Sequence, residues 1–247
     1  MSRSFAPHAF DDAVIGVVGG MGPAATGQFL VELAAALPAE HDQDHPRVIV
    51  LSDTKVPDRT ASIATGDDTP MSMLRADLLR AAELGASVLA VPCNTAHHFI
   101  NAFADELPVP LVHIVDATLT AAQRVSPEGA WLTATAGTVD TGLYQRAAAE
   151  RGYRLEVPSQ EEKDAMMRII GQVKAGRLRE AGEAYRRLAS RLRGSHELPL
   201  MTACTELPLA FDASGLEPGI QISSLTALAQ ATLETAAGTV GRWPADP

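Results

Sequence analysis

The chain contains two cysteines, and the sequence around one resembles the sequence around the other. Cys93 follows the apolar run Ser87–Val91, and Cys204 follows the apolar run Leu198–Ala203. Small polar residues come directly after each cysteine, as they do where a strand passes into a helix. The repeated context indicates a diverged internal duplication in which each half of the chain places one cysteine at the end of a strand.

Strand-like and helix-like segments alternate along the chain. Short apolar runs predict buried strands, and apolar residues at every third or fourth position predict helices. The predicted strands are Ala13–Gly19, Pro46–Leu51, Ser87–Val91, Leu111–Val115, Gly129–Thr135, Tyr153–Val157 and Leu198–Ala203. The predicted helices are Ala24–Ala36, Pro70–Leu84, Thr95–Leu107, Thr141–Arg151, Ala165–Gly176, Leu178–Leu192 and Leu225–Ala237, with a loop at Lys55–Thr65. This order predicts an α/β protein with parallel sheets covered by helices on both sides.

The 247 residues permit one large α/β domain or two smaller ones. A boundary near Asp116–Thr120 would divide the two halves of the duplication. We therefore predict a first domain of residues 1–115 with a returning segment, 216–247, and a second domain of residues 116–215.

Composition restricts the partners and the compartment. The formal net charge is −10, from 30 acidic and 20 basic residues, which argues against nucleic acid. No apolar run approaches the roughly 18 residues of a membrane span, and residues 1–12 do not resemble a signal peptide. Two cysteines are too few for a disulfide framework or a structural zinc site. We expect a cytoplasmic protein with free thiols, and neither a membrane nor a metal as partner.

The position of the cysteines favours a chemical role. Ligands of open parallel sheets bind beyond the carboxyl ends of the strands, and a helix start lowers the pKa of a nearby thiol toward neutrality. A thiolate and a thiol on two sides of one small molecule would act as a base and an acid. They could remove a hydrogen from one face of a carbon and return it to the other. The alternative is that each cysteine is a small buried hydrophobic residue.

Two further segments have a structural and a functional interpretation. Gly20–Ala25 fits the pattern G-x-G-x-x-A, and Asp53 ends the next strand, so the turn either binds a dinucleotide or cradles a carboxylate with its N–H groups. Arg59, within Pro57–Thr60, either lies in a solvated turn or holds a carboxylate by bidentate pairing. Lys174, near a helix end, is typical of a surface residue that complements the helix dipole.

Polar residues beside the cysteines are also open to two interpretations. Asn94, Thr95 and Thr205 are typical helix N-caps, and near a reactive thiol they could instead bind the amino and carboxylate groups of a substrate. Thr138 ends another predicted strand and could do the same. His97 has no metal-binding partner at a suitable spacing, and we expect it to pack behind the site rather than to donate a proton.

Taken in order, these segments resemble the aspartate/glutamate racemase family, and in particular its aspartate racemase branch. They extend over almost the whole chain. The segments that carry the resemblance are Val18–Thr26, Pro57–Thr60, Pro92–His97, Gly137–Thr138, Lys174–Gly176 and Cys204–Leu207.

The resemblance implies two pseudo-symmetric three-layer α/β domains with parallel sheets and an active site in the cleft between them. It implies racemisation of a small amino-acid substrate with no cofactor, neither pyridoxal phosphate nor metal, and a homodimer. Cys93 and Cys204 match the catalytic cysteines of the family, and Arg59 and Lys174 match its contacts to substrate carboxylates. The expected substrate-binding residues are Met21, Gly22, Arg59, Asn94, Thr95, Thr138, Lys174, Thr205 and Glu206.

The predicted function is cofactor-independent racemisation of aspartate, or of glutamate, by a two-base mechanism. Three alternatives stay open from the sequence. One is a related cysteine-dependent isomerase or decarboxylase of a small carboxylic acid that lacks an amino group. The second is an NAD-dependent oxidoreductase, and the third is a non-enzymatic amino-acid sensor.

Overall fold

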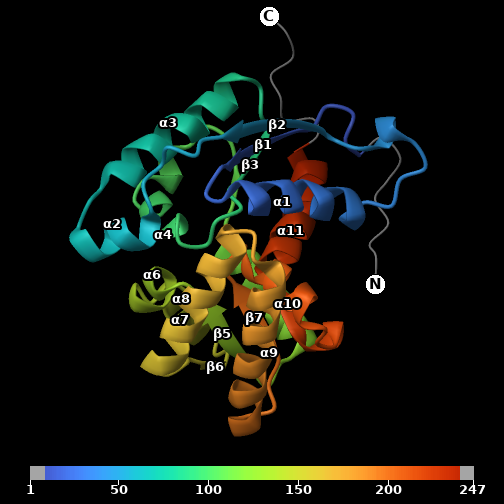
Figure 1. Cartoon of the computed structure of the whole chain (residues 1–247). Helices are drawn as coiled ribbons and strands as arrows, with labels where there is room; N and C mark the ends of the chain where they lie inside the picture. The colour runs from blue at the N-terminus through green and yellow to red at the C-terminus, as the bar shows by residue number, and fades with distance from the viewer. Residues whose placement is uncertain (1–8, 240–247) are drawn as a thin grey trace, which may run out of the picture.

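The structure, a computed structural model, describes residues 9–239 and contains two four-stranded parallel sheets (Figure 1). The strand orders are β2-β1-β3-β4 and β6-β5-β7-β8, so β5 to β8 repeat the topology of β1 to β4. The predicted α/β class and its pseudo-symmetric pair of parallel sheets are thereby confirmed. The strands are β1 (Val14–Gly19), β2 (Arg47–Ser52), β3 (Val88–Ala90), β4 (Leu111–Val112), β5 (Ala130–Ala134), β6 (Leu155–Glu156), β7 (Leu200–Ala203) and β8 (Gln221–Ser223).

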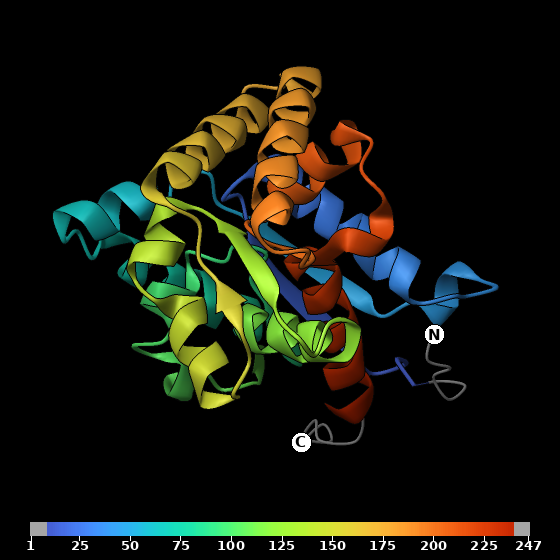
Figure 2. The same ribbon diagram turned by 90° about the horizontal axis from the view of Figure 1, so that it is seen from below.

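Helices cover both faces of each sheet. The α-helices are α1 (Pro23–Ala36), α2 (Arg59–Thr65), α3 (Thr69–Glu83), α4 (His97–Ile100), α5 (Ile114–Val125), α6 (Ala136–Asp140), α7 (Leu143–Glu150), α8 (Gln160–Lys174), α9 (Leu178–Ser195), α10 (Leu207–Ser214) and α11 (Ser224–Thr239). Seen from below, α8 and α9 (gold and orange) lie on one side of the second sheet, and α5 (green) lies on the other (Figure 2). Within residues 9–239, no helix combines the length and apolar character needed to cross a membrane.

The two halves share one hydrophobic core. Val17 of β1 and Leu132 of β5 belong to the same cluster of buried side chains, which also includes Leu228 of α11. Two further clusters lie outside it, one between the first sheet and α3 and one between the second sheet and α8, α9 and α10. Because α11 packs against both α1 and α5, it fixes the halves relative to each other.

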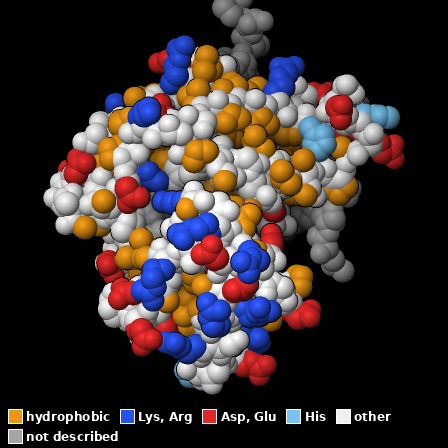
Figure 3. Space-filling view, in the orientation of Figure 1, with side chains coloured by type: hydrophobic (Ala, Val, Ile, Leu, Met, Phe, Trp, Pro, Cys, Tyr) orange, Lys and Arg blue, Asp and Glu red, His pale blue; other side chains and the backbone are white. Residues whose placement is uncertain are grey.

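The second strand differs from its prediction as a buried strand. Val48 and Val50 of β2 are 40% and 39% exposed. The reason is that β2 pairs only with β1 and forms the edge of its sheet. Figure 3 shows hydrophobic side chains gathered on the half of the surface that carries β2 and α1.

The loop prediction for Lys55–Thr65 was wrong over its second part, where α2 forms. The side chain of Asp58 caps this helix by accepting a hydrogen bond from the Ala61 N–H at 3.0 Å. Gly66 ends it in the left-handed conformation, with φ of 69°. The proline that suggested a loop, Pro57, lies just before the cap, where helices tolerate it.

Three segments of the chain fold into shorter or additional elements. The predicted helix Thr95–Leu107 contains only the single turn of α4 and the 3₁₀ helix η2 (Ala104–Glu106), because Phe103 leaves the helical region with φ of −139°. Helix α5 begins at Ile114, inside a predicted strand. Helix α10 and strand β8 were not predicted from the sequence.

The division into domains stays a prediction. Strand β8 pairs with β7, so residues 221–223 belong to the second sheet, although they fall within the segment assigned to the first domain. From Ser224 onward, α11 packs against α1 and α5. We therefore place the return to the first half at the start of α11.

Two glycines within helices provide a matched test of the packing of α9 against α10. A Cβ on Gly182 of α9 would lie 2.4 Å from the carbonyl carbon and oxygen of Ala213, whereas a Cβ on Gly171 of α8 would meet nothing within 4 Å. We expect Gly182→Ala to destabilise the protein by about 1–3 kcal/mol. Gly171→Ala should instead stabilise it by about 0.5–1 kcal/mol. Urea unfolding measures both changes, and shifts of the same sign would contradict the close approach of the two helices.

Candidate functional site

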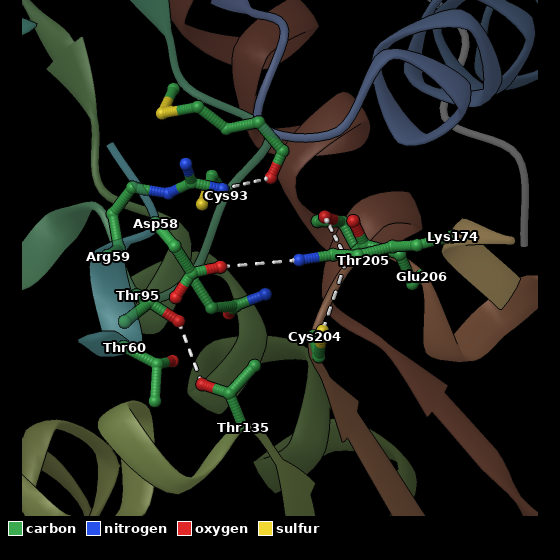
Figure 4. A pocket seen from close by; sticks show the side chains of 12 residues that line it. Asp58, Arg59, Thr60, Cys93, Thr95, Thr135, Lys174, Cys204, Thr205 and Glu206 are labelled. Carbon is green, nitrogen blue, oxygen red and sulfur yellow. Dashed lines mark hydrogen bonds and ion pairs between the residues drawn. The ribbon is translucent and has the colours of Figure 1, made fainter. Parts of the chain in front are cut away.

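The carboxyl ends of the two sheets meet at one pocket between the halves (Figure 4). The cavity itself measures about 20 Å³, within about 300 Å³ of empty space that is partly open to solvent. Its lining residues are Met21, Asp58, Arg59, Thr60, Cys93, Asn94, Thr95, Thr135, Lys174, Cys204, Thr205 and Glu206.

Both cysteines line this pocket. Cys93 follows β3 and Cys204 follows β7, the corresponding strand of the other sheet. The two are free thiols and only 6% and 4% exposed. In Figure 4 Cys93 enters from the side of Arg59, and Cys204 enters from the opposite half of the molecule. The duplicated topology therefore brings two sulfur atoms to one small space.

Most of the residues predicted for the site line the pocket, but Gly22 and Thr138 do not. Gly22 lies behind Glu206, and Thr138 lies behind Thr95, whose hydroxyl is 2.9 Å from its own. The structure adds three lining residues that were not assigned from the sequence: Asp58, Thr60 and Thr135. Asp58 and Thr60 flank Arg59 in the sequence, and this position could have identified them as pocket residues.

Backbone carbonyl groups hold Arg59 in place. Its Nη1 donates hydrogen bonds to Val56 O at 3.2 Å and Pro57 O at 3.0 Å, and its Nη2 donates to Met21 O at 2.8 Å. The side chain is only 8% exposed, and its Nε has no hydrogen-bond partner within the described part of the chain. Because both hydrogens of Nη1 are used, the free donors are the Nε–H and the second hydrogen of Nη2.

Glu206 reaches from the second half toward the first. Its Oε2 accepts hydrogen bonds from Cys204 Sγ at 3.2 Å and from Thr205 Oγ1 at 3.5 Å. Its Oε1 is buried and finds no partner among residues 9–239, and a Cβ on Gly22 would lie 3.1 Å from it. The pocket therefore contains two buried atoms without a hydrogen-bond partner in the described part of the chain, the Nε of Arg59 and the Oε1 of Glu206.

The polar residues after Cys93 connect the two halves. Tyr144 donates to Asn94 Oδ1 at 2.6 Å, and Asn94 Nδ2 donates to Ser224 Oγ at 3.0 Å. The Thr95 hydroxyl lies 2.8 Å from the hydroxyl of Thr135. These contacts use much of the hydrogen-bonding capacity of Asn94 and Thr95, so both side chains stabilise the interface between the halves as well as lining the pocket.

An ion pair spans the rim of the pocket. Lys174 Nζ, at the end of α8, lies 3.7 Å from Asp58 Oδ2, and the two side chains are 43% and 54% exposed. Burial would raise the pKa of Asp58, but the Ala61 N–H and the charges of Lys174 and Arg59 lower it overall. A half-exposed pair of this kind contributes little to stability and exchanges partners readily.

The surroundings of the thiols contradict the expected shift toward neutrality. Burial raises the pKa of Cys93, which the charge of Arg59 offsets only in part. Burial also raises the pKa of Cys204 well above its usual value, and the charge of Glu206 raises it further. Helix α4 has a single turn, and α10 begins only at Leu207, so neither thiol lies at the first turn of a long helix that could compensate.

The glycine-rich turn after β1 packs against protein and not against open space. Gly20 has φ of 89°, and a Cβ there would lie 2.5 Å from the backbone of Asp53. Gly22 faces the carboxylate of Glu206. An anion already occupies the position where a dinucleotide would place its pyrophosphate, so this geometry does not support the NAD alternative. Within residues 9–239 no three His, Cys, Asp or Glu side chains form a group that could hold a metal ion.

His97 supports the backbone behind Cys93. Its Nδ1 is 2.9 Å from Cys93 O and must carry the proton, while its Nε2 accepts from the Ile114 N–H at 3.4 Å. Burial, together with the neighbouring His113, lowers the pKa of His97 to about 3. The neutral ring is therefore the form that the fold requires, as expected for a residue that packs behind the site.

This burial predicts a pH dependence of stability. The pKa of His97 falls from 6.5 in the unfolded chain to about 3 in the folded protein, so the unfolded state binds more protons below pH 6.5. The contribution is complete above pH 6.5 and is lost as the pH falls toward 3. Between pH 7.5 and 5 we expect the wild type to lose about 2 kcal/mol more than His97→Gln, as measured by urea unfolding. Identical losses in the two proteins would contradict a buried neutral imidazole.

Comparisons with known proteins agree with this architecture. The sequence pattern of the Asp/Glu/hydantoin racemase family matches residues 18–232. A broad specificity amino-acid racemase of Bacillus subtilis (strain 168) is 24% identical over 226 residues, which cover 90% of this chain and 97% of the relative. The structure of an aspartate racemase from Picrophilus torridus is similar with a TM-score of 0.79 and 26% identity, over 91% of this chain and 94% of that one. A glutamate racemase from Bacillus anthracis has the same fold, with a TM-score of 0.68 at 18% identity over 94% and 84% of the chains. The chain is an amino-acid racemase that belongs to the Asp/Glu/hydantoin racemase family.

Proposed function

We propose that the protein racemises an acidic amino acid, aspartate or glutamate, with Cys93 and Cys204 as the acid–base pair and without a cofactor. The observation that carries this proposal is the composition of one pocket. Two thiols from corresponding strands line it, and an unpaired cationic donor and an unpaired anionic acceptor accompany them.

The unpaired groups match the charges of an amino acid. Arg59 Nε–H is available for the α-carboxylate, and Glu206 Oε1 is available for the α-ammonium group. Because each group is buried, its unsatisfied hydrogen-bonding capacity has a free-energy cost that a zwitterionic ligand would remove. An acid without an amino group would leave Glu206 unpaired, which favours a racemase over the related isomerases and decarboxylases.

In the proposed reaction one cysteine, as thiolate, removes the α-hydrogen, and the other, as thiol, donates a hydrogen to the opposite face. The roles exchange for the other enantiomer. An acid or base in position accelerates a reaction by roughly 10²–10⁴-fold, so both thiols are needed. Burial makes each thiolate scarcer but also more basic, which suits a weakly acidic α-carbon. Arg59 would stabilise the charge that develops on the α-carboxylate, the larger electrostatic task.

The rim of the pocket supports an acidic side chain in the substrate. Lys174 is a half-exposed cation of the pocket lining, and Asp58 is its present partner. A substrate carboxylate can replace Asp58 because the pair is half-exposed and weak. The low exposure of both cysteines requires the rim of the pocket to move for entry, and its closure would then exclude water.

The breadth of specificity, the homodimer and the cytoplasmic location remain predictions. The Bacillus subtilis relative carries the name of a broad specificity racemase, so a wider range of side chains is the second candidate for this chain. The ion pair of Lys174 with Asp58 supports that candidate, since it neutralises the charge that would select a dicarboxylate.

Exchange of the α-hydrogen tests the two-thiol mechanism. In deuterium oxide, the wild type should replace the α-hydrogen of both enantiomers of its substrate, as followed by proton NMR. Cys93→Ser and Cys204→Ser should each slow racemisation at least about a hundredfold, because each removes one of the two proton carriers. Circular dichroism should show an unchanged fold. Near-normal turnover in either variant would contradict the mechanism.

Lys174→Ala tests the choice of substrate. We expect it to lower kcat/KM for aspartate and glutamate about tenfold, equivalent to about 1.4 kcal/mol, and to leave alanine turnover nearly unchanged. Lys163→Ala is a matched control, since Lys163 lies on the same helix and pairs with the exposed Asp140 outside the pocket. An equal loss with alanine would show that Lys174 does not read the substrate side chain.

A further inference from the structure

The two thiols have different charged neighbours, although their strands correspond. Cys204 Sγ lies 3.2 Å from Glu206 Oε2, and Thr205 Oγ1 lies 3.5 Å from the same oxygen. Two hydrogen-bond donors that converge on one oxygen require it to be an acceptor. This arrangement is that of a carboxylate of Glu206 with a protonated thiol at Cys204.

The position of Glu206 is suited to a negative charge. Its side chain is 4% exposed, and its Oε1 faces Gly22, the residue that caps the N-terminus of α1. Helix α1 has 14 residues, and the unpaired N–H groups and dipole at its N-terminus stabilise a nearby anion. Oε1 has no hydrogen-bond partner among the described residues. The charge on Glu206 is therefore supported from one side by the first half and directed toward Cys204.

Cys93 has the opposite neighbour. Burial raises the pKa of Cys93, and the guanidinium of Arg59, which lies beside its sulfur in Figure 4, offsets part of this rise, while Glu206 adds to it. At Cys204, burial and the charge of Glu206 raise the pKa well above its usual value, and the Glu206 N–H and Lys174 at the rim offset this only in part. Because Asp58 pairs with Lys174, the charge of Lys174 has a smaller effect on the pKa of Cys204.

We propose that Glu206 is a positioning residue that retains the proton of Cys204, so that in the ligand-free protein Cys93 loses its proton before Cys204 does. The inference rests on the proposed function in one respect, that these two thiols are the acid and the base. Cys93 is then the base of the resting protein, and Cys204 is its acid. The enantiomer that presents its α-hydrogen to Cys93 therefore meets the thiol that ionises first.

Alkylation of the two thiols tests this order without any substrate. Iodoacetamide is applied to the full-length protein from pH 6 to pH 11, and peptide mass spectrometry follows each cysteine separately. The pH at half-maximal rate is compared, because it reports ionisation and is independent of the access of the reagent. In the wild type the midpoint of Cys204 should lie at least about one pH unit above that of Cys93, which corresponds to tenfold in ionisation.

Glu206→Gln should lower the midpoint of Cys204 by about one unit or more and that of Cys93 by less. Glu206→Asp, which keeps the charge, should restore part of the difference, and Glu217→Gln, at an exposed carboxyl group, should change neither midpoint. A Cys204 midpoint at or below that of Cys93, or one that Glu206→Gln leaves in place, would overturn the proposal. If Glu206→Gln fails to fold, the comparison of the Cys93 and Cys204 midpoints in the wild type still tests the proposed order.

The outcome is separable from that of the proposed function. If the midpoints follow the expected order but no α-hydrogen is exchanged, the role of Glu206 toward Cys204 is supported and the racemase mechanism is contradicted. If both cysteines are needed for racemisation but their midpoints are equal, the mechanism is supported and the role of Glu206 is contradicted.

Discussion

All strands of a parallel sheet end at the same edge, and this constraint decides where the chemistry of the protein can lie. The chain uses it twice, since β3 and β7 occupy the same place in two sheets of the same topology. Each strand delivers one cysteine to its carboxyl edge, and the pocket forms where the two edges meet. Helix α11 and the shared core make this meeting a property of the fold, because buried side chains of both sheets pack into one cluster.

The pocket contains buried charges that the protein does not fully pair. Arg59 and Glu206 are each more than nine-tenths buried, and each keeps one polar atom without a partner within residues 9–239. Leaving a buried polar atom unpaired costs about 1–3 kcal/mol, and such groups are rare in native structures outside functional sites. Three backbone carbonyls fix the guanidinium and two donors fix the carboxylate, so both groups are oriented before a ligand arrives.

The sequence predicted the features that depend on local patterns. Apolar runs identified seven of the eight strands within two or three residues, and ordered motifs identified most of the pocket lining. Features that depend on neighbours in space were missed or wrong. The exposure of β2 follows from its place at a sheet edge, and the raised pKa values of the thiols follow from burial and from Glu206. Thr135 caps α6 at the end of β5, and its hydroxyl meets that of Thr95 across the two halves, a contact that no spacing along the chain reveals.

A duplicated backbone with unequal charges is consistent with racemisation. The two enantiomers of an amino acid have the same free energy in water, so their final ratio is independent of the enzyme. The proposed mechanism therefore needs the two thiols on opposite sides of the substrate, but it does not need them to have equal pKa values. Arg59 beside Cys93 and Glu206 beside Cys204 affect only which thiol loses its proton first in the ligand-free protein. Duplication supplies the positions of the sulfur atoms in the two halves, and divergence of single residues was free to make one of them lose its proton before the other.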